Sequence, residues 1–130
     1  MADLRTPLNR ARGLGSAKHG VGHFIGQRVS AVALVVLICW SFASTPGLAA
    51  GGYNGARVWL ASAVNAALAS LTLVTGLYHA QLGIRVVIED YFEGAGARTF
   101  LLILNTFVAW TATAVGVISL LKIAFGGVGA

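Results

Sequence analysis

Long apolar stretches separated by short polar segments dominate the pattern of this chain. No Asp, Glu, Lys, Arg or His lies between Arg28 and Arg57, between Arg57 and His79, or between Arg98 and Lys122. A helix needs about 20 apolar residues to cross the ~30 Å hydrocarbon core of a bilayer. The pattern therefore predicts an all-α membrane protein with three transmembrane helices, at about residues 24–44, 57–88 and 99–121.

Breaker residues mark the expected ends of these helices. The Thr-Pro-Gly triplet at 45–47 should end the first helix, because proline removes a backbone donor and glycine favours turns. Residues 46–56, PGLAAGGYNGA, are expected to form a short outside loop. The second predicted helix is longer than a perpendicular crossing requires, so we expect tilt or protrusion on the cytoplasmic side. The stretch EDYFEGAGAR then forms the inner connection.

The distribution of charge predicts the orientation of the chain in the membrane. Residues 1–22 form a polar, basic arm, and residues 23–130 a single three-helix anchor domain. Of the 130 residues, 57% are hydrophobic and 10% are charged, which is too little polar surface for a soluble domain. Two cations, Arg57 and Lys122, lie on one side of the predicted membrane; the other side has Arg5, Arg10, Arg12, Lys18, Arg28, Arg85 and Arg98. By the positive-inside rule the N-terminus is cytoplasmic, or matrix-facing, and the C-terminus is outside.

The same charge distribution bears on other classes of function. The net charge of +5 is explained by membrane topology, and no polar surface suited to contacting bases is evident, so we expect no nucleic-acid partner. Cys39 is the single cysteine, which leaves no internal disulfide and no metal-spaced pair.

The second predicted helix carries ionisable groups at membrane depth. Each residue of an α-helix is rotated by about 100° from the one before it. On this basis five residues lie within about 60° of His79 around the helix axis and share its face: Asn65, Thr72, Gly76, Gly83 and Asp90. Lipid would penalise such a face, so we expect it to look into a helix bundle or at a cofactor.

His79 is the deepest of these groups, and three interpretations are open. It lies about 16 Å along the helix axis from Asp90, near mid-membrane if Asp90 and Tyr91 mark the interface. A neutral imidazole there can ligate a metal, and Gly76 and Gly83 leave room for a flat macrocycle, as beside a haem axial ligand. The alternatives are an imidazole hydrogen-bonded to a neighbouring helix, and a proton relay with Asp90 in a small transporter or proton-conducting subunit.

The polar groups nearer the membrane surface also have two interpretations each. In one interpretation Tyr91 lies in the aromatic belt at the membrane interface and Asp90 is solvated in the loop. In the other they form a quinone site, where the Tyr91 phenol donates to a quinone carbonyl and the Asp90 carboxylate helps deliver protons. Arg28 is either a snorkelling topology anchor or the partner of a carboxylate such as a haem propionate. His19 and His23 are further candidates to which no role is assigned.

Two stretches carry a resemblance to a known family. They are His79-Ala80-x-x-Gly83 followed by Asp90-Tyr91, and the HFxxQR-V-S-A segment at residues 23–31. Together they resemble the small hydrophobic membrane-anchor subunit, the cytochrome b-type D subunit, of succinate dehydrogenase, the succinate:quinone oxidoreductase of respiratory complex II. The three predicted helices and a length near 130 residues are in keeping with that family.

The resemblance implies an anchor that works within a complex and is not an enzyme alone. Flavoprotein and iron–sulfur subunits would oxidise succinate and pass electrons to ubiquinone or menaquinone, and a second membrane-anchor subunit (cytochrome b) would share one haem b with this chain. His79 would be an axial ligand of the haem iron, Arg28 would lie near the propionates, and Tyr91 with Asp90 would contribute to the quinone site. The expected location is the bacterial inner (cytoplasmic) membrane rather than the mitochondrial one. A purely structural anchor that has lost haem stays open beside this interpretation.

Overall fold

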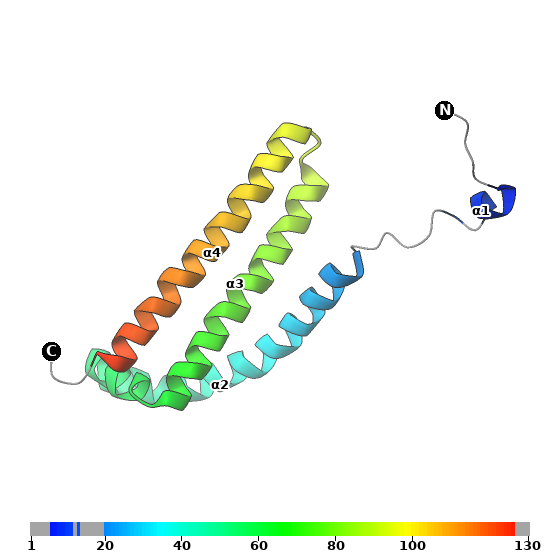
Figure 1. Cartoon of the computed structure of the whole chain (residues 1–130). Coiled ribbons are helices and arrows are strands. Elements are labelled where there is room, and N and C mark those ends of the chain that lie inside the picture. The colour runs from blue at the N-terminus through cyan, green and yellow to red at the C-terminus, as the bar shows by residue number, and fades with distance from the viewer. Residues whose placement is uncertain (1–5, 12, 14–19, 127–130) are drawn as a thin grey trace.

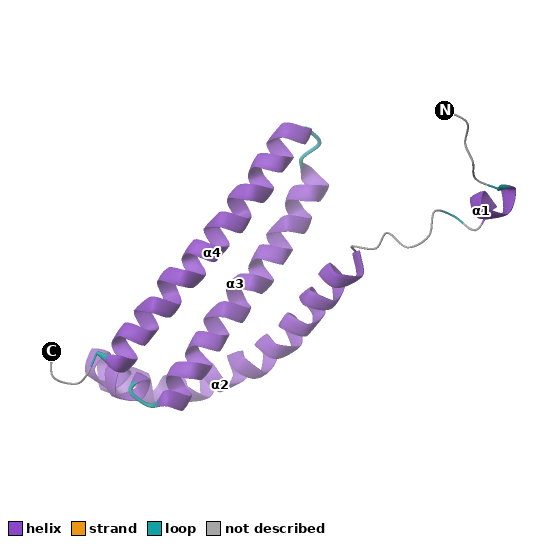
Figure 2. Ribbon diagram, in the orientation of Figure 1, coloured by secondary structure: helices purple, strands orange, loops and turns teal. Residues whose placement is uncertain are grey.

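The described part of the chain is almost entirely helical. The computed structural model describes residues 6–11, 13 and 20–126, and no strand occurs among them (Figure 2). Its four helices are α1 (Pro7–Ala11), α2 (Gly20–Leu60), α3 (Ala63–Tyr91) and α4 (Ala95–Phe125). The spans long and apolar enough to cross a membrane are Gly20–Leu48, Ala63–Tyr91 and Ala95–Phe125. The prediction of an all-α membrane protein with three transmembrane helices is confirmed.

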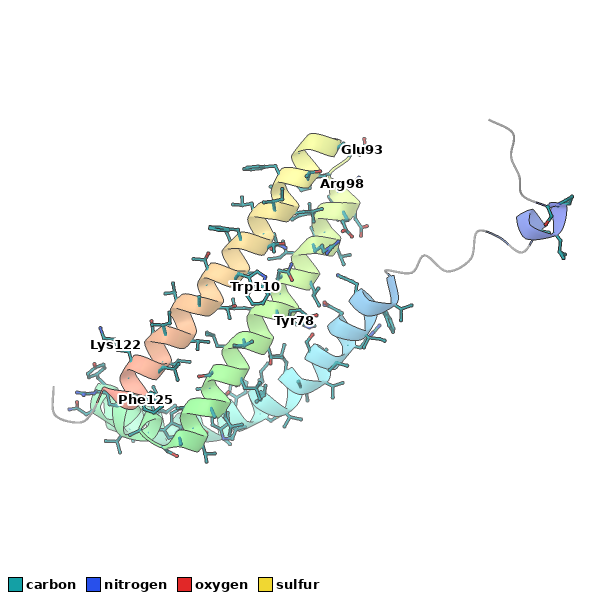
Figure 3. All side chains as sticks on the ribbon, in the orientation of Figure 1. Tyr78, Glu93, Arg98, Trp110, Lys122 and Phe125 are labelled. Carbon is teal, nitrogen blue, oxygen red and sulfur yellow. The ribbon has the colours of Figure 1, made fainter. Side chains whose placement is uncertain are left out.

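The three long helices run up, down and up, with α3 packed between α2 and α4 (Figure 1). The start of α2, the end of α3 and the start of α4 therefore share one end of the bundle, called here the Tyr91 end. The opposite end, where α2 passes into α3, is called the Leu60 end. Figure 3 places Glu93 and Arg98 at the Tyr91 end, and Lys122 and Phe125 at the Leu60 end. That the Tyr91 end faces the cytoplasm stays a prediction from the charge distribution.

The helix α2 does not end at Pro46, so the expected loop at residues 46–56 is wrong. The chain stays helical through Pro46 to Leu60 and is interrupted at Gly52, where φ is 55° and ψ is −149°. A proline inside a helix removes one backbone hydrogen bond and can bend a helix without ending it. The break requires the positive φ that glycine adopts readily. The second spanning helix accordingly begins at Ala63, not at residue 57.

The last turns of α2 fold back against the bundle at the Leu60 end. The rings of Trp40 and Trp59 stack with their centroids 5.4 Å apart. Leu60 is buried, and the Asn65 side-chain amide donates to the backbone carbonyl of Trp59 at 3.0 Å. Ser62, in an extended conformation, is the N-cap residue that precedes α3. These contacts fix a two-residue connection between α2 and α3, with aromatic rings of the kind that gather at membrane interfaces.

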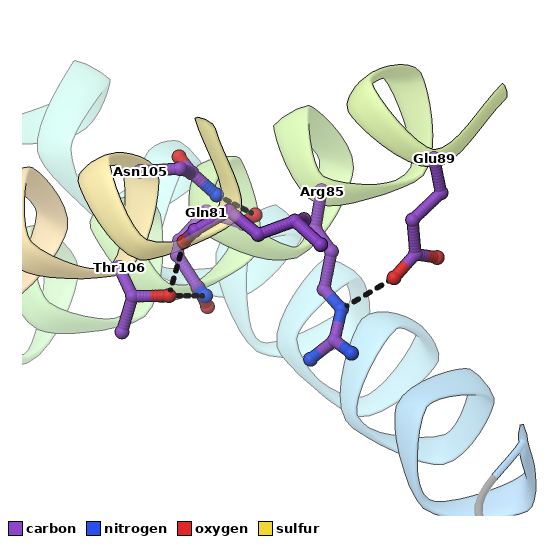
Figure 4. Close-up of polar contacts among 6 residues, drawn as sticks. Gln81, Arg85, Glu89, Asn105 and Thr106 are labelled. Carbon is purple, nitrogen blue, oxygen red and sulfur yellow. Dashed lines mark hydrogen bonds and ion pairs between the residues drawn. The ribbon is translucent and has the colours of Figure 1, made fainter. Parts of the chain in front are cut away.

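The α3 and α4 helices are joined by close packing and by hydrogen bonds. A Cβ atom on Gly116 would lie 2.5 Å from Cδ2 of Leu73, so glycine permits the close approach of the two helices. Nearer the Tyr91 end, the Asn105 side-chain amide donates to the backbone carbonyl of Gln81 at 3.0 Å (Figure 4). The Gln81 side-chain amide donates to the Thr106 hydroxyl at 3.4 Å. Such interhelical hydrogen bonds stabilise helix pairs in membranes by about 0.6 to 2 kcal/mol.

Few side chains are buried within this single chain. The buried hydrophobic residues are Leu37, Leu60, Ala66, Leu82 and Ile88, and α4 contributes none. Large apolar side chains point outward along all three long helices. That outer surface suits contact with lipid or with the apolar helices of other subunits.

Candidate functional site

His79 lies near the middle of α3 and faces α2. It is two residues from the midpoint of Ala63–Tyr91, which corresponds to about 3 Å along the helix axis. Across the interface, α2 presents Gln27 and Ser30, three positions apart and therefore on neighbouring parts of one helix face. The site is thus formed by two helices that lie antiparallel, at a depth well inside the apolar spans.

Both ring nitrogens of His79 contact polar groups of α2. The Ser30 hydroxyl oxygen lies 2.9 Å from Nδ1, and the Gln27 side-chain amide nitrogen lies 3.3 Å from Nε2. The Ser30 hydroxyl also donates to the backbone carbonyl of Gln27 at 3.1 Å. Ser30 is 5% exposed, which makes it the buried polar residue of the described chain. The imidazole is therefore hydrogen-bonded to a neighbouring helix, as one of the three interpretations of His79 expected.

Two buried polar atoms close to this group have no hydrogen-bond partner among the described residues. They are Oε1 of Gln27 and Nε2 of His23. His23, Gln27 and Ser30 are spaced i, i+4 and i+7, so they form one stripe along the α2 face that meets α3. A buried polar atom without a partner costs about 1 to 3 kcal/mol, so such atoms point to an interaction beyond the chain itself. His19 lies outside the described residues.

The predicted polar face of α3 does turn toward α2. Cβ atoms built on Gly76 and Gly83 would have their nearest neighbours at 3.9 Å, on Leu34 and on the Gln27 amide. These are ordinary van der Waals distances, so neither glycine is needed for the α2–α3 approach. Thr72 directs its hydroxyl to the Leu68 carbonyl of its own helix at 2.8 Å.

Asp90 and Tyr91 are not part of the hydrogen-bonded group of His79, Gln27 and Ser30, called here the His79 group. Both are exposed at the C-terminal end of α3, and Tyr91 is 80% exposed. A nearby hollow of about 630 Å³ opens between α2 and α3, and neither Asp90 nor Tyr91 lines it. Its walls come from Gly20, Gly22, His23, Tyr78, Leu82, Arg85 and Glu89. Within this chain, then, Asp90 and Tyr91 are surface groups that only another molecule can enclose.

Arg28 is exposed and lies on a different side of α2 from Ser30. The two residues are separated by about 160° around the helix axis. The Arg28 guanidinium carbon lies 5.3 Å from the centroid of the Phe24 ring, a cation–π distance. Its charge is therefore directed to the outer surface of α2 and not into the α2–α3 interface.

The comparison with known protein families decides the relationship of this chain. The family of succinate dehydrogenase/fumarate reductase transmembrane subunits matches residues 2–115. The chain belongs to this family. The resemblance noted from the two motifs is thereby confirmed, and the chain is a multi-pass succinate dehydrogenase membrane anchor that forms a complex with other subunits.

Several curated proteins are similar to this anchor subunit over most of their length, and each is named a succinate dehydrogenase hydrophobic membrane anchor subunit. The protein from Rickettsia conorii is 35% identical over 103 residues, which are 78% of this chain and 82% of the relative. The protein from Paracoccus denitrificans is 30% identical over 123 residues, 95% of both chains. No solved structure gives a significant match.

Two members of the His79 group were not predicted from the sequence of the anchor subunit. Gln27 and Ser30 lie on either side of Arg28 in the HFxxQR-V-S-A segment, and their residue types alone indicate no role. The available signal was the i, i+4, i+7 spacing of His23, Gln27 and Ser30 at the start of an apolar stretch, which places three polar groups on one helix face.

The remaining charged group of this region, Arg85, is paired within its own helix. Its Nε donates to Oε1 of Glu89 at 2.9 Å, and both side chains are roughly half exposed (Figure 4). An exposed pair of this kind contributes little to stability. The described residues of the anchor subunit contain no group of three or more His, Cys, Asp or Glu side chains able to hold a metal ion.

Proposed function

We propose that this anchor subunit holds one side of a haem b through His79 and contributes Tyr91 and Asp90 to a quinone-reduction site. Electrons would pass from the iron–sulfur subunit to ubiquinone or menaquinone. The observation that carries the proposal is the position of His79: an imidazole near the centre of a spanning helix, turned inward and held by polar side chains. Ionisable groups at this depth are costly, so their presence indicates function.

The residues around His79 fit a haem on three counts. His79 would hold the haem iron through one neutral imidazole nitrogen, and the second membrane-anchor subunit would supply the other protein ligand. Gly76 and Gly83, about one turn on either side of His79 in α3, present no side chain beside the ring. The unpartnered Oε1 of Gln27 provides a polar atom beside the ring, and the unpartnered Nε2 of His23 belongs to a residue about one turn away along α2. When bound, the haem supplies a one-electron carrier at mid-membrane.

Hydrogen bonding of His79 to α2 does not exclude ligation. An imidazole has two nitrogens, and a metal-ligating histidine ordinarily donates its second N–H to a neighbour. Ligation through Nε2 would replace the longer contact with Gln27 and keep the contact of Nδ1 with Ser30, so the two interpretations are compatible. The proton-relay alternative finds less support, because Asp90 is exposed at the end of α3 and makes no contact with the His79 group.

The exposed groups at the Tyr91 end suit a site that other subunits complete. The Tyr91 phenol would donate to a quinone carbonyl, and the Asp90 carboxylate beside it would help deliver protons. Because both side chains are open to solvent in the single chain, the iron–sulfur subunit and the second membrane-anchor subunit would enclose them. Arg28 would meet a haem propionate from the outer surface of α2, where a guanidinium can bind a carboxylate with two hydrogen bonds.

The proposal includes an orientation and a domain division. We place the Tyr91 end on the cytoplasmic side of a bacterial inner membrane, where the flavoprotein and iron–sulfur subunits would dock. The Rickettsia and Paracoccus relatives support a bacterial setting. Residues 1–22 would form the basic arm on that side, and residues 23–130 the membrane anchor.

The proposal is tested by purifying the complex from its native membrane through a tag on this chain. Subunits are identified by mass spectrometry, and the optical spectrum is recorded before and after succinate is added. We expect flavoprotein, iron–sulfur and second anchor subunits, with b-type absorption bands. A complete complex without b-type bands would identify a purely structural anchor. Recovery of the chain without redox subunits, together with proton transport in liposomes, would favour the relay.

A further inference from the structure

A single hydroxyl proton determines how Ser30 and His79 interact. The Ser30 hydroxyl donates its proton to the backbone carbonyl of Gln27, three residues earlier in α2, at 3.1 Å. Serine side chains in helices commonly bond backward in this way. While its proton is directed to that carbonyl, the Ser30 oxygen acts toward Nδ1 of His79, 2.9 Å away, as an acceptor. In this arrangement the Nδ1 atom carries the proton.

The other side of the ring agrees with this assignment. A neutral imidazole with a proton on Nδ1 has its lone pair on Nε2. The group 3.3 Å from Nε2 is the side-chain amide nitrogen of Gln27, which is a donor. Both contacts from α2 are thus satisfied by one tautomer, and that tautomer leaves Nε2 as the basic nitrogen.

The two contacts differ in how firmly they are held. Ser30 is 5% exposed and is bonded to its own backbone as well as to His79. Gln27 is held to His79 by one longer contact, and its Oε1 has no partner among the described residues. An iron atom that takes the Nε2 lone pair would displace the Gln27 amide and leave the Ser30 contact in place.

We propose that Ser30 is a positioning residue for His79, which fixes the Nδ1–H tautomer so that Nε2 faces the haem iron. The inference rests on the proposed haem ligation and deepens it. A hydrogen bond from the second imidazole N–H to an oxygen orients the ring and makes the ligating nitrogen more basic. A more basic ligand stabilises ferric over ferrous iron, so Ser30 would also lower the reduction potential of the haem.

The first test is redox potentiometry of the haem in the purified complex. Ser30→Ala should shift the midpoint potential to a more positive value and weaken haem retention by about tenfold to a hundredfold. Ser30→Thr keeps the hydroxyl and should restore both properties. The matched control is Ser44→Ala, on the same helix, where the hydroxyl bonds only to the Trp40 carbonyl at 3.0 Å. An unchanged potential and haem content in Ser30→Ala would overturn the inference.

The second test does not require haem and separates this inference from the proposed function. Nitrogen NMR of histidine-labelled full-length chain in lipid bilayers reports which ring nitrogen carries the proton. For His79 we expect a protonated Nδ1 in the wild-type chain and a loss of that preference in Ser30→Ala. A wild-type His79 protonated on Nε2 would overturn the role of Ser30, whether or not haem binds. A complex without haem but with the Nδ1–H tautomer would instead refute the haem proposal alone.

Discussion

Ser30 of α2 and His79 of α3 are 49 positions apart in the sequence, and their Oγ and Nδ1 atoms lie 2.9 Å apart in the bundle. The contact joins the two motifs from which the family was first identified, the segment at residues 23–31 and the stretch from His79 to Tyr91. It gives those motifs a shared physical purpose, since one supplies the ring and the other holds it. The consequences can be tested residue by residue.

Gly83 provides a test of the space beside His79. A Cβ at this position would meet the Gln27 amide only at 3.9 Å, so Gly83→Ala should leave assembly and haem content close to wild type. Gly83→Leu fills the same space and should lower the haem-to-protein ratio of the purified complex while the subunits still assemble. The matched control is Ala80→Leu, which adds a similar volume on an exposed part of α3. Full haem content in Gly83→Leu would contradict the proposed placement.

Tyr91 tests the quinone site separately from the haem. Tyr91→Phe removes one hydroxyl from a side chain that is 80% exposed, so the fold should be unaffected. We expect succinate:quinone reductase activity to fall by about a hundredfold, the lower range for loss of one hydrogen-bond donor to a reacting carbonyl oxygen. Succinate oxidation with an artificial acceptor and the haem spectrum should be retained.

The control for that experiment is Tyr53→Phe, at the opposite end of the bundle, where the side chain is 74% exposed. Its ring would keep the contact with Arg57, whose guanidinium carbon lies 6.0 Å from the ring centroid. Equal quinone activity in the two variants would show that the Tyr91 hydroxyl has no part in quinone reduction.

Gly116 tests the packing of α3 against α4. Gly116→Ala places a Cβ 2.5 Å from Cδ2 and 3.4 Å from Cγ of Leu73, so the leucine side chain must move. Overpacking of this kind costs about 1 to 3 kcal/mol, and the variant should lower the thermal midpoint of the complex. Gly96→Ala, where no atom lies within 4 Å of the added Cβ, should instead raise it slightly, because alanine favours helix. The thermal midpoint should therefore fall in Gly116→Ala and rise in Gly96→Ala. A rise of the thermal midpoint in both variants would mean that α3 and α4 are farther apart at Gly116.

Much of the fold was predictable because membrane spans are encoded locally. Charge-free stretches predicted the number of spanning helices, and helix periodicity placed Gly76, His79 and Gly83 on one face, which in the structure meets α2. The fate of Pro46 was not predictable in the same way, since a proline can either end or bend a helix. Gly52, one of several glycines in that segment, makes the break.

The partners of His79 could not be derived from the second helix alone. Helix periodicity gives a direction around one axis, but not the register of one helix against another. Gln27 and Ser30 are common residue types beside a charged arginine, so their identity does not mark them as partners of His79. The only local indication that Gln27 and Ser30 share a helix face is their spacing with His23. The contacts with His79 also depend on how α2 is aligned lengthwise against α3.

The central claim is tested most directly by the reduced-minus-oxidised optical spectrum of the purified complex carrying His79→Ala. Thr72→Ala serves as the control, since Thr72 lies on the same face of α3 and bonds only to its own helix. With equal recovery of all subunits, we predict that the b-type bands are lost or altered in His79→Ala and unchanged in Thr72→Ala. A wild-type haem spectrum in the assembled His79→Ala complex would contradict the assignment of His79 as the haem ligand.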